Sequence, residues 1–278
     1  MKNNKKDFIY LTALVLTFLV LVFFYIKRTY LYGATTDWYQ HNISIPEYFR
    51  TLFYSSKDLF PDLALNIGSG QNIYNLSYYG LLNPIILLSY LFPHISMLNY
   101  LTFTTILIVL ISTIMMYKFL RKHDFNEEVS LISSMCFLLS TPIVLHSHHH
   151  LMYINYFPFL LMGLYGVDKK FKTNKSWLLI LSVFLMIMTS YYFSIAGILC
   201  VLIYALYVYL QKNRKVTLKS FFKTLFYMIG PILIGIFLSS LVTIPSLLAI
   251  WARRVDTTSI IEPVELFIHP LELPILYK

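Results

Sequence analysis

The sequence predicts an all-α, polytopic integral membrane protein. Hydrophobic residues make up 58% of the 278 residues and charged residues only 13%, whereas soluble domains carry about 25% charged residues. Several separate apolar runs approach the length of about 20 residues that crosses a bilayer as a helix. No repeat of fixed period and no polar linker divides the chain. We therefore expect a single transmembrane domain over residues 1–278.

The first apolar run covers residues 8–26 and follows the basic start MKNNKK. It is longer than the apolar core of a signal peptide, and no small-residue cleavage site comes after it. We expect this run to stay in place as the first membrane helix, with the N-terminus inside.

A long polar stretch, the predicted outer loop at residues 29–97, follows this helix. Its last part, the segment LLNPIILLSYLFP at 81–93, is apolar but short and contains prolines. A span needs about 20 residues, and proline interrupts a helix. We expect 81–93 to be a re-entrant or interfacial segment that returns to the outer face.

The distribution of basic residues supports this orientation. If 81–93 does not cross the membrane, most of the 22 Lys and Arg residues fall on the inner side; if it crosses, most fall outside, against the positive-inside bias. The basic residues form short clusters between apolar runs, which indicates topology and excludes nucleic acid as a partner. The result is about seven spans, which we place approximately at residues 8–26, 98–117, 129–146, 151–167, 177–190, 192–210 and 224–250.

Asp37, in the stretch TTDWYQH, is the leading candidate for a catalytic residue. A carboxylate at the membrane surface suits a general base that removes a proton from an acceptor hydroxyl. Its neighbours Trp38 and Tyr39 could stack on a sugar or lie at the interface. The alternative is that Asp37 only caps a helix, because Thr-Asp is also good N-cap chemistry.

Asp62, in FPDLALNIGSGQN, is the secondary acid candidate, as a second acid or as a metal ligand. The alternative is a loop carboxylate in a turn after Pro61.

Histidines gather where the predicted spans 129–146 and 151–167 meet on the outer face. Imidazole can bind a metal or, when charged, an anion. Adjacent positions at a helix end point in different directions, so a single histidine facing the site is favoured over a metal centre, and we assign no metal ligands. A divalent metal is the one cofactor that the sequence leaves open. The candidates for substrate binding here are His148 and His150, with Tyr191 in the nearby Ser-Tyr-Tyr turn.

Arg253 and Arg254 follow the last apolar run, on the face where basic residues are otherwise scarce. Guanidinium groups bind phosphate oxygens through two parallel hydrogen bonds, which suits a lipid phosphate leaving group. The alternative is that they reach into the lipid headgroups. The sequence does not say which of the two would contact phosphate.

Three stretches together resemble the YfhO family of bacterial membrane proteins, which is similar to the GT-C class of glycosyltransferases. They are TTDWYQHNISIPEYFRTLF, LNIGSGQNIYNLSYYGLLNPIILLSYLFP and LHSHHHLMYINYFPFLLMGLY. The acidic residue in the first outer loop of the family, with its aromatic and Gln neighbours, matches Asp37, Tyr39 and Gln40. The family's later Arg matches Arg253 or Arg254. Family members are generally longer, so the resemblance implies the N-terminal part of a longer protein.

The resemblance implies a membrane glycosyltransferase that uses a sugar carried on polyprenyl phosphate. The acceptor would be a cell-envelope glycopolymer of the teichoic acid type, on the outer face of the bacterial cytoplasmic membrane. The implied partners are the lipid-linked sugar, the polymer acceptor, the lipid bilayer and the enzyme that loads the lipid carrier.

Two other classes of function stay open at this stage. One is a transporter or flippase of lipid-linked sugars, although such proteins place ionisable residues within their spans and these spans contain few. The other is a truncated, non-catalytic membrane protein.

Overall fold

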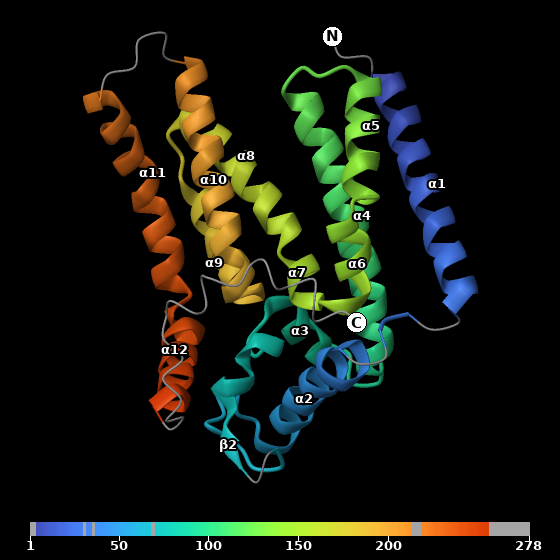
Figure 1. Cartoon of the computed structure of the whole chain (residues 1–278), viewed down its shortest axis with the longest axis vertical. Helices are drawn as coiled ribbons and strands as arrows, with labels where there is room; N and C mark the ends of the chain where they lie inside the picture. Colours follow the sequence, from blue (N-terminus) through green and yellow to red (C-terminus); the bar gives the residue numbers. More distant parts are fainter. Residues whose placement is uncertain (1–3, 30–31, 35–36, 68–69, 213–217, 256–278) are drawn as a thin grey trace, which may run out of the picture.

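The computed structural model describes residues 4–29, 32–34, 37–67, 70–212 and 218–255 of the chain. Two groups of long helices stand side by side, and a compact segment of short helices and a small hairpin covers one end of both (Figure 1). The predicted all-α membrane fold is confirmed. We call the end of the molecule at the start of α1 the inner end, and the opposite end the outer end.

The first helix group surrounds α4 (Met97–Lys122), against which α1 (Asn4–Thr29) and α5 (Glu127–Leu138) pack. α4 begins where the Ser96 hydroxyl accepts the Asn99 N–H, and α5 begins where the Asn126 carboxamide accepts the Val129 N–H. Side chains at the helix N-terminus satisfy N–H groups that have no partner within the helix. Apolar residues from α1, α4, α5 and the following helices form the core of this group: Phe18, Ile108, Val109, Leu138, Ile143 and Ile154.

The predicted span at 129–146 is bent in the structure. α5 ends at Leu138 and α6 (Thr141–His149) continues at an angle of 44° to it. Pro142 lies at the start of α6 and has no N–H to donate to the carbonyl four residues earlier, so the helix cannot continue straight. α6 therefore diverges from the direction of α5 toward the outer end.

The second helix group consists of α8 (Phe157–Thr173), α9 (Trp177–Thr189), α10 (Tyr191–Lys212) and α11 (Leu218–Leu238), preceded by the short α7 (Leu151–Asn155). α8 and α9 approach each other closely. A Cβ atom at Gly166 would lie 2.8 Å from the backbone nitrogen of Leu179, so only glycine permits this approach. The core between these helices contains Val167, Leu179, Val183, Met186 and Val201.

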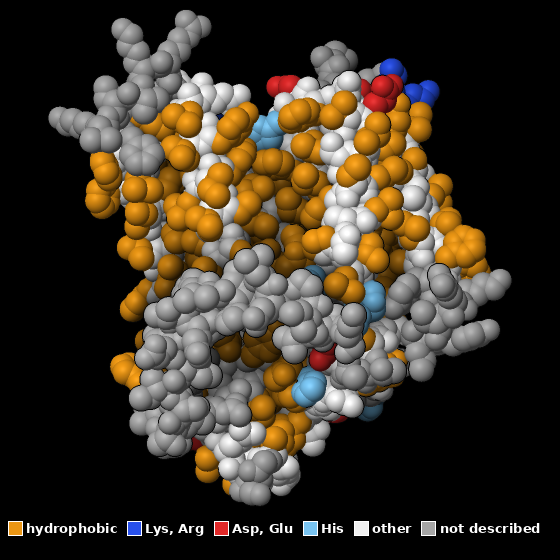
Figure 2. Space-filling view, viewed as in Figure 1, with side chains coloured by type: hydrophobic (Ala, Val, Ile, Leu, Met, Phe, Trp, Pro, Cys, Tyr) orange, Lys and Arg blue, Asp and Glu red, His pale blue; other side chains and the backbone are white. Residues whose placement is uncertain are grey.

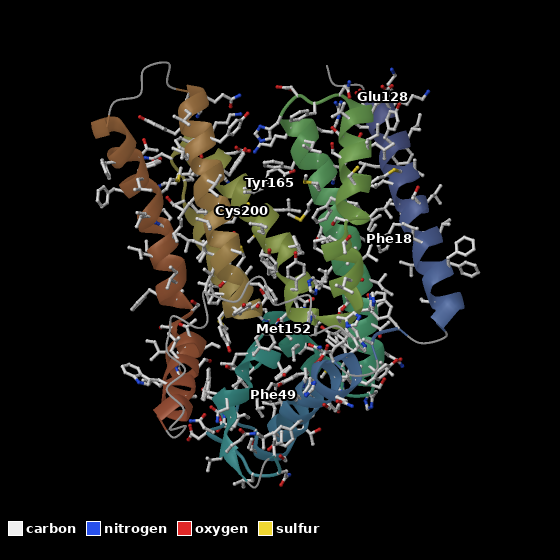
Figure 3. The ribbon with its side chains drawn as sticks, in the orientation of Figure 1. Phe18, Phe49, Glu128, Met152, Tyr165 and Cys200 are labelled. Atoms are coloured by element: carbon white, nitrogen blue, oxygen red, sulfur yellow. The ribbon has the colours of Figure 1, made fainter. Side chains whose placement is uncertain are left out.

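The outer segment, residues 32–96, folds against the outer end of both groups. It contains a short π-helix, η1 (Trp38–Ile43), followed by α2 (Ser44–Ser56), a two-stranded antiparallel hairpin of β1 (Leu63–Ala64) and β2 (Gln71–Asn72), and the 3-10 helix η2 (Ile73–Tyr79). Figure 3 shows Phe49 inside this segment and Met152 where the segment meets the long helices.

Residues 81–93 form only single turns of helix, α3 (Pro84–Leu88) and η3 (Ser89–Leu91), far shorter than the about 20 residues of a span. The buried Asn83 carboxamide accepts the Ile85 N–H and donates to the Thr189 carbonyl at 3.2 Å. This side chain therefore holds the segment against the C-terminal end of α9.

The predicted span at 224–250 is bent in the structure, as the span at 129–146 is. α11 ends at Leu238, and α12 (Ser240–Val255) continues at an angle of 69° to it. The break lies at the Ser239-Ser240 pair, and such pairs are a known cause of sharp bends. After the bend, α12 packs against η2 of the outer segment (Figure 1).

By length and composition, three helices of the described residues can cross a membrane: Lys5–Phe24, Met97–Lys122 and Tyr191–Lys212. The number rises to five if each bent pair counts as one span. Two predicted spans remain. The span at 151–167 is interrupted at Tyr156, between α7 and α8, and the span at 177–190 corresponds to the shorter helix α9. Both run beside the other helices (Figure 1).

Charged side chains visible in Figure 2 gather mainly at the inner end, above two helix groups covered with hydrophobic side chains. There Arg121 on α4 contacts Asp7 on α1 and Glu127 on α5, each at 2.6 Å. Asp168 on α8 accepts hydrogen bonds from Lys122 at 2.6 Å and Tyr204 at 2.7 Å. These groups join the inner ends of five helices, a network that the sequence analysis did not anticipate.

Candidate functional site

The outer segment attaches to the C-terminal end of α6 through three successive carbonyl groups. The Tyr32 hydroxyl donates to the Ser147 carbonyl at 2.7 Å, the Ala34 N–H to the His148 carbonyl at 2.8 Å, and the Asn42 carboxamide to the His149 carbonyl at 2.9 Å. The last carbonyls of a helix have no partner within it. The outer segment supplies these partners, and this fixes it relative to the histidines.

Trp38 anchors the same region from inside. Its side chain is fully buried and packs against Ile86, Leu101 and Met152. Gly33, with φ +103°, lies so close that an added Cβ would be 2.1 Å from the indole ring. The expectation that Trp38 could stack on a sugar or lie at the membrane interface is therefore wrong, because its apolar ring is part of the core.

Asp37 precedes Trp38 at the start of η1. Its side chain makes no capping hydrogen bond, so the alternative in which Asp37 only caps a helix is not what the structure shows. The carboxylate is 44% exposed, and its Oδ2 lies 4.0 Å from Nδ1 of His149. A π-helix is rare, and short π segments are frequent at functional sites. η1 holds the buried Trp38 and the solvent-facing Asp37 next to each other.

Aromatic rings extend the surface beside Asp37. The rings of His41 and Tyr79 are stacked with centroids 5.4 Å apart, and Tyr78 lies edge-on to Tyr191 and Tyr192 with centroids 6.4 Å apart in each case. The η2 tyrosines thus connect the Asp37 region to the turn between α9 and α10. We call the set Asp37, His41, Tyr78, Tyr79, His149 and Tyr191 the outer site.

The outer site carries a negative charge close to phenol groups. Burial is the main reason why the pKa of Tyr78 rises to about 12, and the neighbouring tyrosines and Asp37 add to it. Burial, followed by the Asp37 charge, also raises the pKa of Tyr79. Both phenols therefore stay protonated at neutral pH and can donate hydrogen bonds to a ligand.

The structure brings only some of the predicted site residues together. Tyr191 belongs to the outer site. Tyr39 donates its hydroxyl to the Tyr32 carbonyl at 2.9 Å, which is a structural role, and the exposed Gln40 points away from the core. His148 and His150 flank His149, with ring centroids at 4.7 Å and 6.3 Å from it.

Asp62 is exposed and directly precedes the first strand of the hairpin. Burial is the main reason why the pKa of Tyr74 is raised, and the charges of Asp62 and Asp58 raise it further. Among the described residues, no hydrogen bond or ion pair joins Asp62 to the outer site. Arg253 and Arg254 lie in the last turn of α12, not beyond the helix end, and their side chains are outside the described residues.

His149, Asn42 and the Tyr78-Tyr79 pair were not predicted as site residues from the sequence. His149 is the middle one of three consecutive histidines, and the sequence gives no means to say which of them faces Asp37. The motif YYG was recognised only as part of a resemblance. The contact of its first tyrosine, Tyr78, with Tyr191 depends on the tertiary fold.

Within the described part of the chain, no three His, Cys, Asp or Glu side chains converge as a group that could hold a metal ion. Asp37 and His149 are a pair only and do not make up such a group.

The comparisons with known proteins give one match. A family model described as "Bacterial membrane protein YfhO" matches residues 10–273. No curated protein and no solved structure matches the chain.

Proposed function

Since the chain belongs to the YfhO family of bacterial membrane proteins, we propose that it is a glycosyltransferase of the cytoplasmic membrane. It would transfer a sugar from a polyprenyl-phosphate donor to a cell-envelope glycopolymer of the teichoic acid type, on the outer face. The observation that carries this proposal is the pair of Asp37 and His149. The Asp37 carboxylate makes no helix-capping hydrogen bond and lies beside the His149 imidazole.

The separation within this pair fits an acceptor hydroxyl. A distance of 4.0 Å is too long for a direct hydrogen bond. A hydroxyl group can nevertheless bridge the two side chains, with its oxygen about 2.8 Å from both atoms. It would donate a hydrogen bond to the Asp37 carboxylate and accept a hydrogen bond from the His149 N–H. In this arrangement Asp37 takes the hydroxyl proton as the oxygen attacks the sugar, and the configuration at the sugar carbon is inverted.

The aromatic part of the outer site supports a sugar substrate. Tyr79, stacked on His41, and the exposed ring of Tyr192 beside Tyr78 provide flat apolar surfaces with hydroxyl groups at their edges. Aromatic side chains of this kind present an apolar face together with a hydrogen-bonding group. A sugar ring has the matching combination of C–H faces and hydroxyl edges.

The leaving phosphate requires positive charge. Arg253 or Arg254 would supply it from α12, which packs against η2, the helix that carries Tyr78 and Tyr79. Stabilising the charge that develops on the phosphate would be the larger contribution to the rate, and proton removal by Asp37 would add about 10² to 10⁴-fold.

The test is sugar transfer from a polyprenyl-phosphate hexose by the full chain in lipid vesicles. Asp37→Asn should lower the turnover by about 10² to 10⁴-fold. Asp58→Asn is the matched control, because Asp58 also lies in the outer segment and its carboxylate accepts the local Phe60 N–H at 2.8 Å. Normal turnover by Asp37→Asn would reject the assigned base, and no transfer by the wild-type chain would reject the activity.

A further inference from the structure

An apolar groove opens between α1 and α6 near the outer end. α1 packs along α5, but α6 leaves the direction of α5 by 44° at Pro142. Because α1 follows α5, it cannot also follow the bent α6, and a wedge-shaped space is left between α1 and α6. Its volume is about 240 Å³, and Phe18, labelled in Figure 3, lies on its α1 side.

The walls of this groove are almost entirely hydrocarbon. α1 contributes Phe18, Leu21 and Val22, and the bent α5–α6 pair contributes Leu138, Leu139, Ile143 and Val144. Leu139 and Val144 are 55% and 46% exposed. The walls belong to the predicted spans 8–26 and 129–146, so in the predicted topology the groove faces the hydrocarbon phase.

Polar groups gather at only one end of the groove: Tyr32, Ser147 and His148. This end is next to the outer site, because the ring of His148 lies 4.7 Å from that of His149, which faces Asp37. A molecule with its hydrocarbon part in the groove would therefore place its polar head beside Asp37 and His149.

We propose that this groove binds the part of a prenyl chain nearest the phosphate of a lipid-linked sugar, and that it thereby directs the sugar to the outer site. This inference rests on the function proposed above. A bilayer phospholipid has similar hydrocarbon, but the continuity of the groove with the Asp37–His149 pair assigns the position to the lipid on which the site acts.

The test measures binding alone, with undecaprenyl phosphate as the probe and the full chain in nanodiscs, by native mass spectrometry. Val144→Trp fills the groove and should weaken retention of undecaprenyl phosphate about tenfold, since the indole takes the place of the prenyl chain and removes on the order of ten of its carbon–carbon contacts with the groove walls. Leu145→Trp is the matched control. Leu145 is the next residue on α6, is 44% exposed like Val144 and does not line the groove.

A second pair of variants on α1 covers the case in which Val144→Trp does not fold. Leu21 lines the groove and Val20 does not, so Leu21→Trp should weaken retention of undecaprenyl phosphate and Val20→Trp should not. Equal retention by lining and control variants would overturn the proposal. Equally effective competition by phosphatidylglycerol would also overturn it, because the groove would then be a general lipid site.

The two proposals fail separately. Binding of undecaprenyl phosphate requires no sugar transfer. If the wild-type chain is inactive but binds undecaprenyl phosphate in a groove-dependent way, the proposed transferase activity is rejected and the proposed prenyl-binding groove stands. Conversely, if sugar transfer depends on Asp37 but is unaffected by Val144→Trp and Leu21→Trp, the proposed transferase activity stands and the proposed role of the groove is rejected.

Discussion

Oδ2 of Asp37 lies 4.0 Å from Nδ1 of His149, although more than a hundred residues separate the two in the chain. The link between them is Asn42, a buried side chain whose carboxamide donates to the Asp37 carbonyl and to the His149 carbonyl, each at 2.9 Å. One amide group therefore sets the relative position of the proposed base and its imidazole partner.

Asn42→Ala should both destabilise the protein and lower its activity. The change removes the carboxamide donor from two partly buried carbonyl groups, and a buried polar group left unsatisfied costs about 1–3 kcal/mol. Thermal unfolding in detergent measures the loss of stability, and the transfer assay measures the loss of activity. The exposed Asn99, whose side chain is not part of this region, gives the control Asn99→Ala. Activity and melting temperature that match this control would contradict the positioning role of Asn42.

Gly33→Ala tests whether the buried Trp38 ring fixes the position of the backbone that leads to Asp37. Gly33 has φ +103° and an added Cβ would meet the Trp38 ring at 2.1 Å. Gly70 provides a matched control, since its φ is +95° and an added Cβ meets nothing within 4 Å. Positive φ costs about 1–2 kcal/mol for an alanine at either position, so the excess loss at Gly33 measures the clash.

We expect Gly33→Ala to lower the unfolding temperature more than Gly70→Ala and to alter the fluorescence of Trp38. Equal shifts in unfolding temperature for the two variants would show that Trp38 adapts freely, and the buried indole would then not fix the position of Asp37.

Alkaline pH should destabilise the outer site through Tyr78. Its pKa rises from 10.0 to about 12 in the folded protein, mainly by burial. The folded state then holds a proton that the unfolded state releases, so the stability from this group is complete below about pH 10 and is lost as the pH rises toward 12. Tyr78→Phe should therefore reduce the fall in unfolding temperature between these pH values.

Tyr207→Phe is the control for this measurement, because its ring is 55% exposed and Tyr207 is not among the groups that raise the pKa of Tyr78. Removal of its hydroxyl should leave the pH dependence of unfolding close to that of the wild type. The same pH dependence for the wild type and Tyr78→Phe would contradict the environment that the structure gives Tyr78.

The sequence predicted those features that depend on one-dimensional patterns. Apolar length indicated the membrane helices, and proline with short length indicated that 81–93 would not form a full span. The bends at Pro142 and Ser239 were missed because hydropathy is continuous across them: an apolar run records burial in lipid and not the direction of the helix axis. The prolines were visible, but membrane helices tolerate proline, so its presence alone does not predict a bend.

The site was predicted in part for the same reason. Asp37 was identified as a lone carboxylate near a helix end, which is a local signal. The role of Trp38 was misjudged because an aromatic residue beside a membrane helix has the same sequence context at the interface and in a core. The partner of Asp37 could not be chosen among three adjacent histidines, since the choice depends on how the Asn42 carboxamide and the Ala34 N–H meet the end of α6.

Arg121 at the inner end gives a prediction that does not depend on the function. Its guanidinium is 11% exposed and lies 2.6 Å from carboxylates of both Asp7 and Glu127. Arg121→Met would take the guanidinium away from two partly buried carboxylates, at a cost of about 2–4 kcal/mol, and it would weaken the attachment of α1 and α5 to α4. Equilibrium unfolding of the purified protein in detergent measures this cost.

Lys118→Met is the matched control, because Lys118 is an exposed residue on the same helix and its loss removes the same charge from the inner end. A general effect of charge on membrane insertion would lower the yield of both variants equally. The ion pair predicts more: adding Asp7→Asn to Arg121→Met should restore part of the lost stability, because one of the two carboxylates that lose the Arg121 charge is then neutral. Additive losses in the double variant would instead assign the effect of Arg121 to its packing, and the contact with Asp7 would contribute little to holding α1 in place.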